Sequence, residues 1–441
     1  MKKISRFATE GDLLSFTGNI IGKTFGQIDA LKLLNIATKD KGILGKVVET
    51  GFYGYKLNND AKADFDNLGI ELKVSGYEVN KNGTRSPKER LPLSKINYGE
   101  IINEEFEFSK FLFKNKKLLI VWYEFIKGNN YSDFVITHFQ LHDLSKDMDI
   151  IKNDFYLIKS KVSDGLAHKL SEGDTSFLGA FPKGRLGTDR VKQPNSETGA
   201  MPRGFCLKKS YLRGILRNPI LISFQTDYKT VEEYILDKIQ PYIGLTQRDI
   251  WLKLTGKDIT NKKIISYQLN KSISNKILGK DEKLKEKHDL FNKTECIIKN
   301  LPVDENFYPR ERLAFRNLTL SEFDSRWEES AWKMYLEELT FLIILYSGPK
   351  HGDRKLETVK KITFSQEDIN LFGETYERVR ETIKSGDIEY LPTPKSFNGQ
   401  LLVVAPKSVK GAHAYKTFLE ENNTKVCFML EKDFIYKKLI E

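Results

Sequence analysis

Residues 63–73 carry the residue types that a metal-dependent phosphodiester hydrolase needs. Asp64 lies seven positions before Glu71, and Gly69 precedes a short apolar strand that holds Glu71 and Lys73. Because side chains alternate along a strand, Glu71 and Lys73 must point to the same face. Two carboxylates can bind Mg²⁺ through hard oxygen ligands, and an ammonium group can orient water or stabilise developing negative charge.

An acid-x-base triplet is a weak motif in a chain this rich in charge. With 60 acidic and 71 basic residues in 441, roughly ten such triplets are expected by chance. Most of them lie on the solvated faces of strands or helices. The upstream acid, the glycine before the strand and the apolar Ile70 and Leu72 distinguish this triplet from the others.

The overall composition narrows the functional classes. A length of 441 residues predicts two or three domains, and 40% hydrophobic residues suffice for real cores. The net charge of +11 favours a polyanionic partner, nucleic acid first, although lysine-rich solvated faces give a similar excess. Three widely spaced cysteines, Cys206, Cys296 and Cys427, indicate neither a disulfide framework nor a thiolate zinc site.

The sequence offers no segment for export or membrane insertion. Basic residues follow Met1 without the apolar stretch of a signal peptide. The longest apolar run, residues 339–346, is far shorter than the about 20 residues that span a bilayer. We therefore expect a cytoplasmic protein with no membrane partner.

The elements around the acidic stretch follow from apolar periodicity. Residues 8–36 predict one or two amphipathic helices, and residues 42–54 predict a further helix that carries Glu49. On the residues alone, Glu49 is better interpreted as an ordinary surface acid. Lys117 opens the apolar strand 118–123, where a solvated strand end is the commoner explanation than a cation at an active edge.

Two basic loops bounded by glycine and proline follow later in the first half. One contains Lys183 and Arg185, and the other, residues 202–213, contains Arg203, Lys208 and Lys209. Such loops allow close backbone approach to DNA and provide cations for phosphates and base edges. Ordinary solvated turns explain either loop equally well when it is taken alone.

The second half of the sequence repeats the first in order. Four short matches pair residues 21–24 with 243–246, 70–74 with 296–300, 180–183 with 404–407 and 207–209 with 430–432. Their offsets, between 222 and 226 residues, are nearly constant, as expected for a duplicated domain. We place the two domains at residues 1–225 and 226–441.

The second copy has lost its acidic residues. Ile297 stands at the position of Glu71, Leu290 at that of Asp64, and the position of Glu49 falls near Ile273. Two lysines, Lys299 and Lys407, remain in the second copy at the positions of Lys73 and Lys183. Loss of the carboxylates abolishes divalent-metal binding and leaves a basic surface, so the second domain is predicted to bind DNA without cutting it.

Residues 68–73 and 202–209 resemble the signatures of the MutH mismatch-repair endonuclease and its relatives among GATC-cutting type II restriction enzymes. The tandem arrangement is similar to the subgroup whose C-terminal domain is an inactive relative of the catalytic domain. The resemblance implies an α/β protein of two tandem restriction-endonuclease-like (PD-(D/E)xK) domains, each a mixed β-sheet flanked by helices.

The resemblance also implies roles for individual residues. It assigns Asp64 and Glu71 to Mg²⁺, Lys73 to the attacking water or the charged transition state, and Glu49 to the outer part of the metal site. Lys117 matches a further functional lysine of the repair enzyme. It also assigns base reading to Lys183. From the basic loops and the second copy, we expect Arg185, Arg203, Lys208, Lys209 and Lys407 to contact DNA as well.

Two departures from the repair enzyme limit what the resemblance implies. Phe181 stands where the repair enzyme has an arginine, and Cys206 where it has a tyrosine that senses the site. The response of this chain to methylation therefore does not follow from the resemblance.

The predicted activity is Mg²⁺-dependent double-strand cleavage of DNA at GATC, which the resemblance implies occurs 5′ of the G. The expected partners are GATC-containing duplex DNA and a second copy in a transient homodimer on DNA. The C-terminal domain is expected to bind a second GATC copy as an allosteric effector. A cognate methyltransferase acts on the same site but need not bind. The alternatives are a mismatch-repair-type nickase and a non-catalytic DNA-binding regulator.

Overall fold

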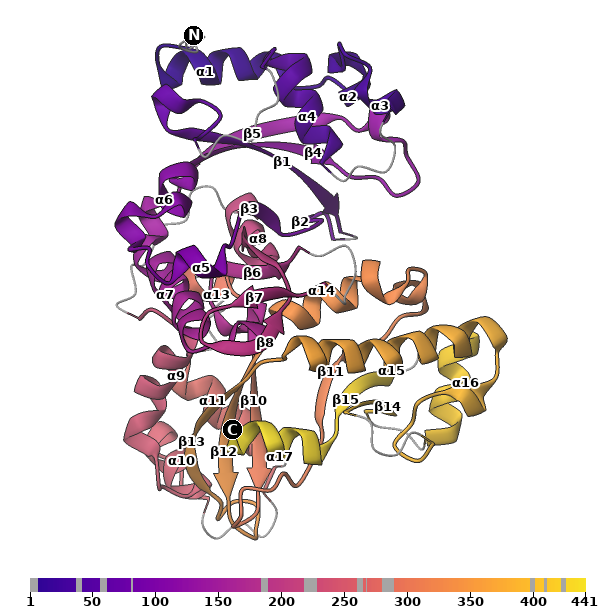
Figure 1. The fold of residues 1–441 in the computed structure, drawn as a ribbon. Helices are drawn as coiled ribbons and strands as arrows, with labels where there is room; N and C mark the ends of the chain where they lie inside the picture. The colour runs from indigo at the N-terminus through magenta and orange to yellow at the C-terminus, as the bar shows by residue number, and fades with distance from the viewer. Residues whose placement is uncertain are drawn as a thin grey trace. The chain divides into compact units, whose positions relative to one another are not determined.

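The chain folds into two compact α/β units (Figure 1). Unit 1 comprises Met1–His168 and Thr175–Ile222, and unit 2 comprises Lys169–Asp174 and Ser223–Glu441. The computed structural model describes residues 7–36, 42–55, 62–80, 82–183, 189–217, 228–259, 265–266, 268–279, 289–396, 401–407, 411–421 and 426–441. The predicted α/β class is confirmed.

Unit 1 alternates short helices with strands. Its helices are α1 (Glu10–Thr17), α2 (Phe25–Ile28), α3 (Leu33–Ile36), α4 (Ile43–Lys46), α5 (Tyr98–Ile101), α6 (Lys110–Asn115), α7 (Met148–Ser163) and α8 (Lys209–Arg217). Its strands are β1 (Ile70–Val79), β2 (Arg85–Pro87), β3 (Leu91–Lys95), β4 (Lys117–Glu124), β5 (Ile136–Asp143), β6 (Leu178–Pro182), β7 (Val191–Gln193), β8 (Ser196–Ala200) and β9 (Arg203–Leu207).

The N-terminal helical region of unit 1 is more broken than its periodicity predicts. Residues 8–36 form three short α-helices instead of one or two longer ones, because Gly22 takes a left-handed φ of 79° that a helix cannot contain. Residues 42–54 begin as α4 and continue as a π-helix over Val47–Phe52, which carries Glu49. π-Helical turns are rare and occur often at functional sites.

The main sheet of unit 1 has the strand order β2-β1-β4-β5. β1 and β4 are parallel, with Glu71 opposite Leu118 and Lys73 opposite Ile120. A second sheet has the order β3-β9-β6. Ile70 and Leu72 enter the core under α1, α2 and α4, so the alternate residues of β1 face the other side of the sheet.

The described part of unit 2 contains fewer strands than that of unit 1, and it includes the long helix α15. Its helices are α9 (Val231–Ile239), α10 (Gln247–Thr255), α11 (Leu269–Ile277), α13 (Asp289–Asn292), α14 (Ala331–Glu338), α15 (Gln366–Ser385), α16 (Gly411–Glu421) and α17 (Lys432–Ile440). Its strands are β10 (Cys296–Val303), β11 (Leu313–Asn317), β12 (Thr340–Ser347), β13 (Lys355–Ile362), β14 (Leu402–Pro406) and β15 (Val426–Leu430).

The sheets of unit 2 have the same strand order as those of unit 1. β10-β12-β13 corresponds to β1-β4-β5 within the four-stranded sheet, and β11-β15-β14 corresponds to β3-β9-β6. Figure 1 shows the three corresponding strands of each main sheet side by side. β10 and β12 are parallel, with Ile297 opposite Phe341 and Lys299 opposite Ile343. The register therefore gives Ile297 and Lys299 the places of Glu71 and Lys73.

Smaller features recur in both units. Thr24 and Thr246 each cap a helix in a capping box, and each forms an isolated bridge to the strand region that follows, with Val135 and Lys355 respectively. These recurrences extend the sequence repeat to the level of hydrogen bonds.

The polypeptide leaves unit 1 after His168, contributes Lys169–Asp174 to unit 2 and re-enters unit 1 at Thr175. Within unit 2, Ser171 donates to the carbonyl of Phe364, and Thr340 Oγ1 donates to the carbonyl of Gly173 at 3.2 Å. Gly173 is buried, and a Cβ at this position would lie 2.9 Å from the Cβ of Thr363, so only glycine fits.

In the described part of the chain, no helix has the length and apolar character needed to cross a membrane.

Candidate active site

The acidic stretch folds into a compact polar site at the start of β1. Gly69 takes a φ of 64° after the 3₁₀ turn Asp66–Leu68, which folds the preceding residues back over the strand. The backbone N–H of Asp64 donates to Glu71 Oε2 at 3.2 Å, and Asp64 Oδ2 accepts from the N–H of Leu72 at 3.0 Å. The turn therefore brings both carboxylates to one place.

Two ammonium groups contact the buried carboxylate of Glu71, whose side chain is only 4% exposed. Lys73 Nζ lies 2.8 Å from Glu71 Oε1, and Lys114 Nζ lies 3.5 Å from the same atom. Lys114 is on α6, which begins at the N-cap Ser109. Lys114 is not among the predicted site residues, because only the tertiary fold brings this short helix to the start of β1.

Burial and, second, the negative charge of Glu71 raise the pKa of Asp64 to about 6. The N–H of Leu72 and the charges of Lys73 and Lys114 act in the opposite direction. Two carboxylates in a dry site repel each other, and a cation between them removes that repulsion. The electrostatics of the site thus favour cation binding.

The donor set fits a magnesium ion better than a metal that needs a full protein cage. Among the described residues, no group of three or more His, Cys, Asp or Glu side chains is placed to hold a metal. Mg²⁺ is typically bound by one or two carboxylates, with water and substrate phosphate as the other ligands. Asp64 and Glu71 provide that pair.

The structure does not bring Glu49 into a three-carboxylate group with Asp64 and Glu71. Glu49 is half-buried on the π-helix, and its carbonyl accepts from the N–H of Tyr55. Lys117 is at the first residue of β4 and forms an ion pair with Glu10 of α1. The hydrogen bond that Lys117 donates to Glu10 within this pair raises the pKa of Lys117. Lys117 therefore has a carboxylate partner outside the acidic pair.

The loop after β6 brings Lys183 towards the same region. Partial burial lowers the pKa of Lys183, and the nearby charges of Lys73 and Lys95 lower it further. The backbone N–H of Lys183 donates to the carbonyl of Pro202 at 2.8 Å, which fixes the start of the loop. Arg185 lies outside the described residues.

Two residues that we predicted to bind DNA instead make internal contacts. Arg203 is 2% exposed and donates from Nη1 to the carbonyl of Ala180 at 2.5 Å. Lys208 is 2% exposed and donates to the carbonyl of Thr175. Neither can reach a phosphate from these positions, so the prediction is corrected for both. Lys209, the first residue of α8, is half-buried.

A buried carboxylate explains why Lys208 is internal. Asp154 of α7 is fully buried and accepts from the N–H groups of Ser176, Phe177 and Leu178 at 2.6–2.9 Å. Lys208 lies within electrostatic reach and provides the compensating charge. This pair fixes the start of β6 and, through β6, the position of the Lys183 loop.

Among the described residues of unit 2, the position that corresponds to Glu71 holds no acid. Ile297 packs against the apolar core of unit 2, while Lys299 remains half-buried on the same strand. Burial lowers the pKa of Lys299, and the charge of Lys407 and, more weakly, that of Lys271 lower it further, whereas Cys427 and Glu311 act in the opposite direction. Lys407 itself is exposed directly after β14. The side chains of Asp289 and Leu290 lie outside the described part.

The cations of unit 2 extend beyond Lys299 and Lys407. Burial lowers the pKa of Arg354, and the nearby charge of Arg310 lowers it further, whereas Glu311 raises it. We define the basic cluster of unit 2 by residues linked through these interactions: Lys271, Lys299, Arg310, Arg354 and Lys407. Glu311 is the acid that interacts with both Lys299 and Arg354.

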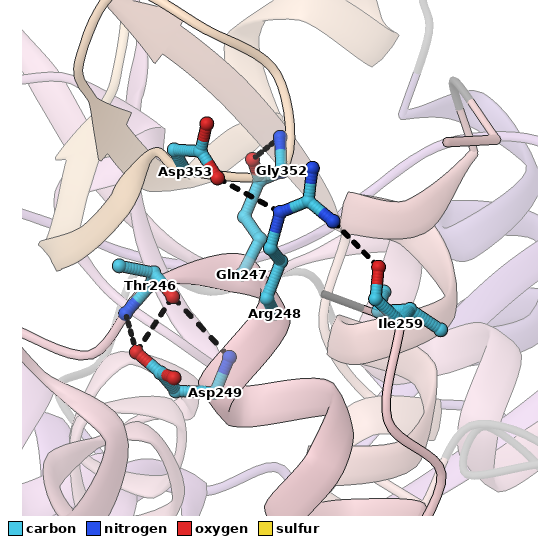
Figure 2. Close-up of polar contacts among 7 residues, drawn as sticks. All are labelled: Thr246, Gln247, Arg248, Asp249, Ile259, Gly352 and Asp353. Atoms are coloured by element: carbon cyan, nitrogen blue, oxygen red, sulfur yellow. Dashed lines mark hydrogen bonds and ion pairs between the residues drawn. The ribbon is translucent and has the colours of Figure 1, made fainter. Parts of the chain in front are cut away.

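Helix α10 fixes the loop that carries Arg354. Gln247 accepts from the N–H of Gly352 at 2.6 Å, and its own N–H donates to the carbonyl of Arg354 at 2.9 Å. Figure 2 shows Arg248 donating to Asp353 Oδ1 and to the carbonyl of Ile259. The loop is therefore held by both side chains and backbone.

The chain is similar to known DNA mismatch repair and restriction enzymes. The family model for the DNA mismatch repair enzyme MutH matches residues 53–154, which include Asp64, Glu71, Lys73 and Lys114. The type II restriction enzyme Sau3AI of Staphylococcus aureus is 30% identical over 390 residues, covering 82% of this chain and 78% of that protein. The DNA mismatch repair protein MutH of Actinobacillus pleuropneumoniae serotype 3 (strain JL03) is 26% identical over 227 residues, covering 49% of this chain and 97% of that protein.

Proposed function

The chain belongs to the MutH-like type II restriction endonucleases, which are site-specific deoxyribonucleases, and from this premise we propose that it cuts both strands of DNA at GATC, 5′ of the G, with Mg²⁺. One observation carries the proposal. Asp64 and Glu71 share a site at the start of β1 in which two lysines contact Glu71. This combination of donors and cations fits metal-assisted phosphodiester hydrolysis.

Each residue of the site has a distinct part in the proposed reaction. A bound divalent ion lowers the pKa of a coordinated water and polarises the phosphate. Asp64 and Glu71 would hold that ion, and both must be ionised to do so. Lys73 holds the Glu71 carboxylate in place and provides positive charge where the attacking water and the phosphate meet. Lys114 adds a second positive charge from α6.

The repeated strand order supports two tandem restriction-endonuclease-like domains of the PD-(D/E)xK type. In this proposal, unit 1 cuts DNA and unit 2 binds a second GATC copy as an effector. The basic cluster of unit 2, on a frame without the acidic pair, supports binding without chemistry.

GATC is a palindrome, and the proposal gives each chain one cutting site. Cleavage of both strands therefore requires two chains on the DNA or two successive nicks, and we favour a transient homodimer. A cognate methyltransferase would act on the same sequence without binding this protein.

Digestion of a mapped plasmid tests the proposal. We expect linear fragments that end at GATC in Mg²⁺ and intact plasmid in chelator. Comparing adenine-methylated with unmethylated plasmid then determines the methylation response. Fragments that end at another sequence would overturn the proposed specificity, and cleavage that persists in chelator would overturn the metal dependence.

The MutH match and the MutH relatives favour one second candidate, a GATC nickase of the mismatch-repair type. A nickase would convert the same plasmid to open circles only, at any enzyme concentration. Linear product that rises with enzyme concentration excludes this candidate.

A further inference from the structure

A turn in unit 2 carries an aromatic residue in a conformation that aromatic residues rarely adopt. Phe307 has a φ of 62°, in the left-handed region, within the loop between β10 and β11. A bulky side chain is strained in this region, where glycine or asparagine is usual. The Phe307 side chain is also exposed, with 40% of its surface open to solvent. Folding alone gains little from an exposed ring in a strained turn.

The same turn in unit 1 has the residue that the backbone prefers. In unit 1, Gly83 has a φ of 78°, and its N–H donates to the carbonyl of Asn80 at 2.8 Å. In unit 2, the N–H of Phe307 donates to the carbonyl of Asp304 at 3.1 Å. The two turns thus share a hydrogen bond and a backbone conformation, and differ in the residue at the strained position.

The turn in unit 2 is rigid enough to present the ring. Asp304 Oδ1 accepts from the N–H groups of Asn306 and Tyr308, both at 2.9 Å. Tyr308 also donates to Asp433 Oδ1 at 2.7 Å. A ring held in place before binding loses little conformational freedom when it inserts into a partner.

The charges that follow the turn identify the partner. Arg310 is exposed three residues after Phe307, and it interacts electrostatically with Arg354 of the basic cluster. Arg310 also continues the hairpin, since its N–H donates to the carbonyl of Pro302 at 2.9 Å. An exposed aromatic residue with an exposed arginine three positions away, itself linked to the basic cluster, fits nucleic acid, whose bases stack on rings and whose phosphates bind cations.

We propose that unit 2 inserts Phe307 between bases of the DNA that it binds, while the basic cluster holds the phosphates. This inference rests on the proposed binding of DNA by unit 2. It adds a wedge that unit 1 lacks, because Gly83 has no side chain to insert. The DNA bound by unit 2 would then be locally unstacked.

The first test uses the full chain and a plasmid with one GATC site, with a GATC duplex added in trans. Phe307→Asn keeps a residue that tolerates the left-handed region and removes the ring. We expect it to raise the duplex concentration for half-maximal stimulation about tenfold, the usual effect of losing one base–aromatic stack. Phe307→Tyr should stay close to wild type. Ile440→Asn removes another exposed apolar side chain of unit 2 and serves as the matched control.

The second test detects the unstacked base directly. Duplexes that carry 2-aminopurine at successive positions across and beside GATC are bound to the full chain in chelator. We expect one position to gain fluorescence with the wild-type protein and with Phe307→Tyr, and to lose most of that gain with Phe307→Asn.

Thermal unfolding separates a binding role from a structural one. Phe307→Asn should have an unchanged or higher melting temperature, because the strain in the turn is relieved. Three results with Phe307→Asn would each overturn the proposed insertion of Phe307: a lower melting temperature, unchanged stimulation and fluorescence, or a changed oligomeric state without DNA. If wild-type protein is not stimulated by added duplex, the effector proposal fails, and the fluorescence test still decides the wedge.

Discussion

Units 1 and 2 place different chemistry on the same frame. In both units, the main sheet contains a parallel strand pair, and the register between the two strands is the same. Ser109 and Ser330 cap the helices that precede the second strand of each pair. Both sites are therefore built from the same elements.

The difference lies in a few side chains at the start of the first strand. Glu71 is replaced by Ile297, which joins the apolar core. Lys114 lies three residues before β4, and the buried Glu337 lies three residues before β12, so the helix of unit 2 contributes the opposite charge. Lys73 and Lys299 are the same residue at the same register. Under the proposed function, the two units share a DNA-binding frame, and metal chemistry needs only a small local addition to it.

The largest expected effect tests whether cleavage depends on unit 1 alone. Glu71→Gln should lower the rate of plasmid cleavage by at least about 10³-fold, because it removes a metal ligand and the charge that both lysines contact. Glu311→Gln, in unit 2, removes an acid without changing unstimulated cleavage. A large loss of that cleavage in the Glu311 variant would contradict the assignment of chemistry to unit 1.

The second test concerns Lys114, the lysine whose counterpart in unit 2 is the acidic Glu337. Lys114→Ala should lower cleavage about 10²-fold, comparable to removing one preorganised group that stabilises transition-state charge. Lys110→Ala on the same helix breaks only the exposed ion pair with Glu100 and should have little effect. We expect Lys117→Ala to cause a smaller loss than Lys114→Ala. Equal losses for Lys114 and Lys117 would remove the distinction between them.

The third test measures how strongly the acidic site destabilises unit 1 without metal. The pKa of Asp64 is raised to about 6 from 3.8, so the folded state binds more protons between these values. Stability therefore falls as pH rises through this window, and the full penalty applies above about pH 6. Asp64→Asn should raise the free energy of unfolding by about 2 kcal/mol at pH 7.5 in chelator, and much less at pH 4.

The control for this test is the neighbouring Asp66→Asn. Asp66 is exposed and paired with Lys62, so its loss should change stability by no more than about 0.5 kcal/mol. Thermal unfolding of both variants at the two pH values provides the measurement. If Asp64→Asn destabilises the protein at pH 7.5, the like-charge repulsion that favours metal binding is absent.

The smallest expected effect tests the proposed binding of DNA by unit 2. Lys407→Ala or Lys299→Ala should raise the effector duplex concentration for half-maximal stimulation about tenfold. Each should also reduce the salt dependence of duplex binding by the amount expected for about one phosphate contact. Unstimulated cleavage should not change. Lys384→Ala, at the end of α15, is the matched control. Equal effects of Lys384 and Lys407 would indicate that only net charge matters.

Strand pattern made part of this structure predictable. The alternation of Ile70, Glu71, Leu72 and Lys73 is enough to place the acid and the lysine on one face, and their hydrogen-bonded contact follows from strand geometry. The order of the repeated segments predicted which strand of unit 2 would correspond to β1.

Other features depend on tertiary contacts that no local pattern encodes. Arg203 and Lys208 have the composition of a DNA-binding loop, yet Ala180 and the buried Asp154 draw them inside. The sequence also contains no signal for the left-handed conformation of Phe307, because propensity alone would place glycine or asparagine there.

The crossing of Lys169–Asp174 into unit 2 has a consequence for the order of events during synthesis. Unit 2 receives this segment from the first half of the chain, while its partners Thr340 and Phe364 are made much later. Unit 1 can close while the ribosome is still translating the second half, but the segment must wait for those partners. A released C-terminal fragment that starts at residue 226 would lack it altogether. The nascent protein therefore matures in two steps, and the second step joins an early piece of chain to a late one.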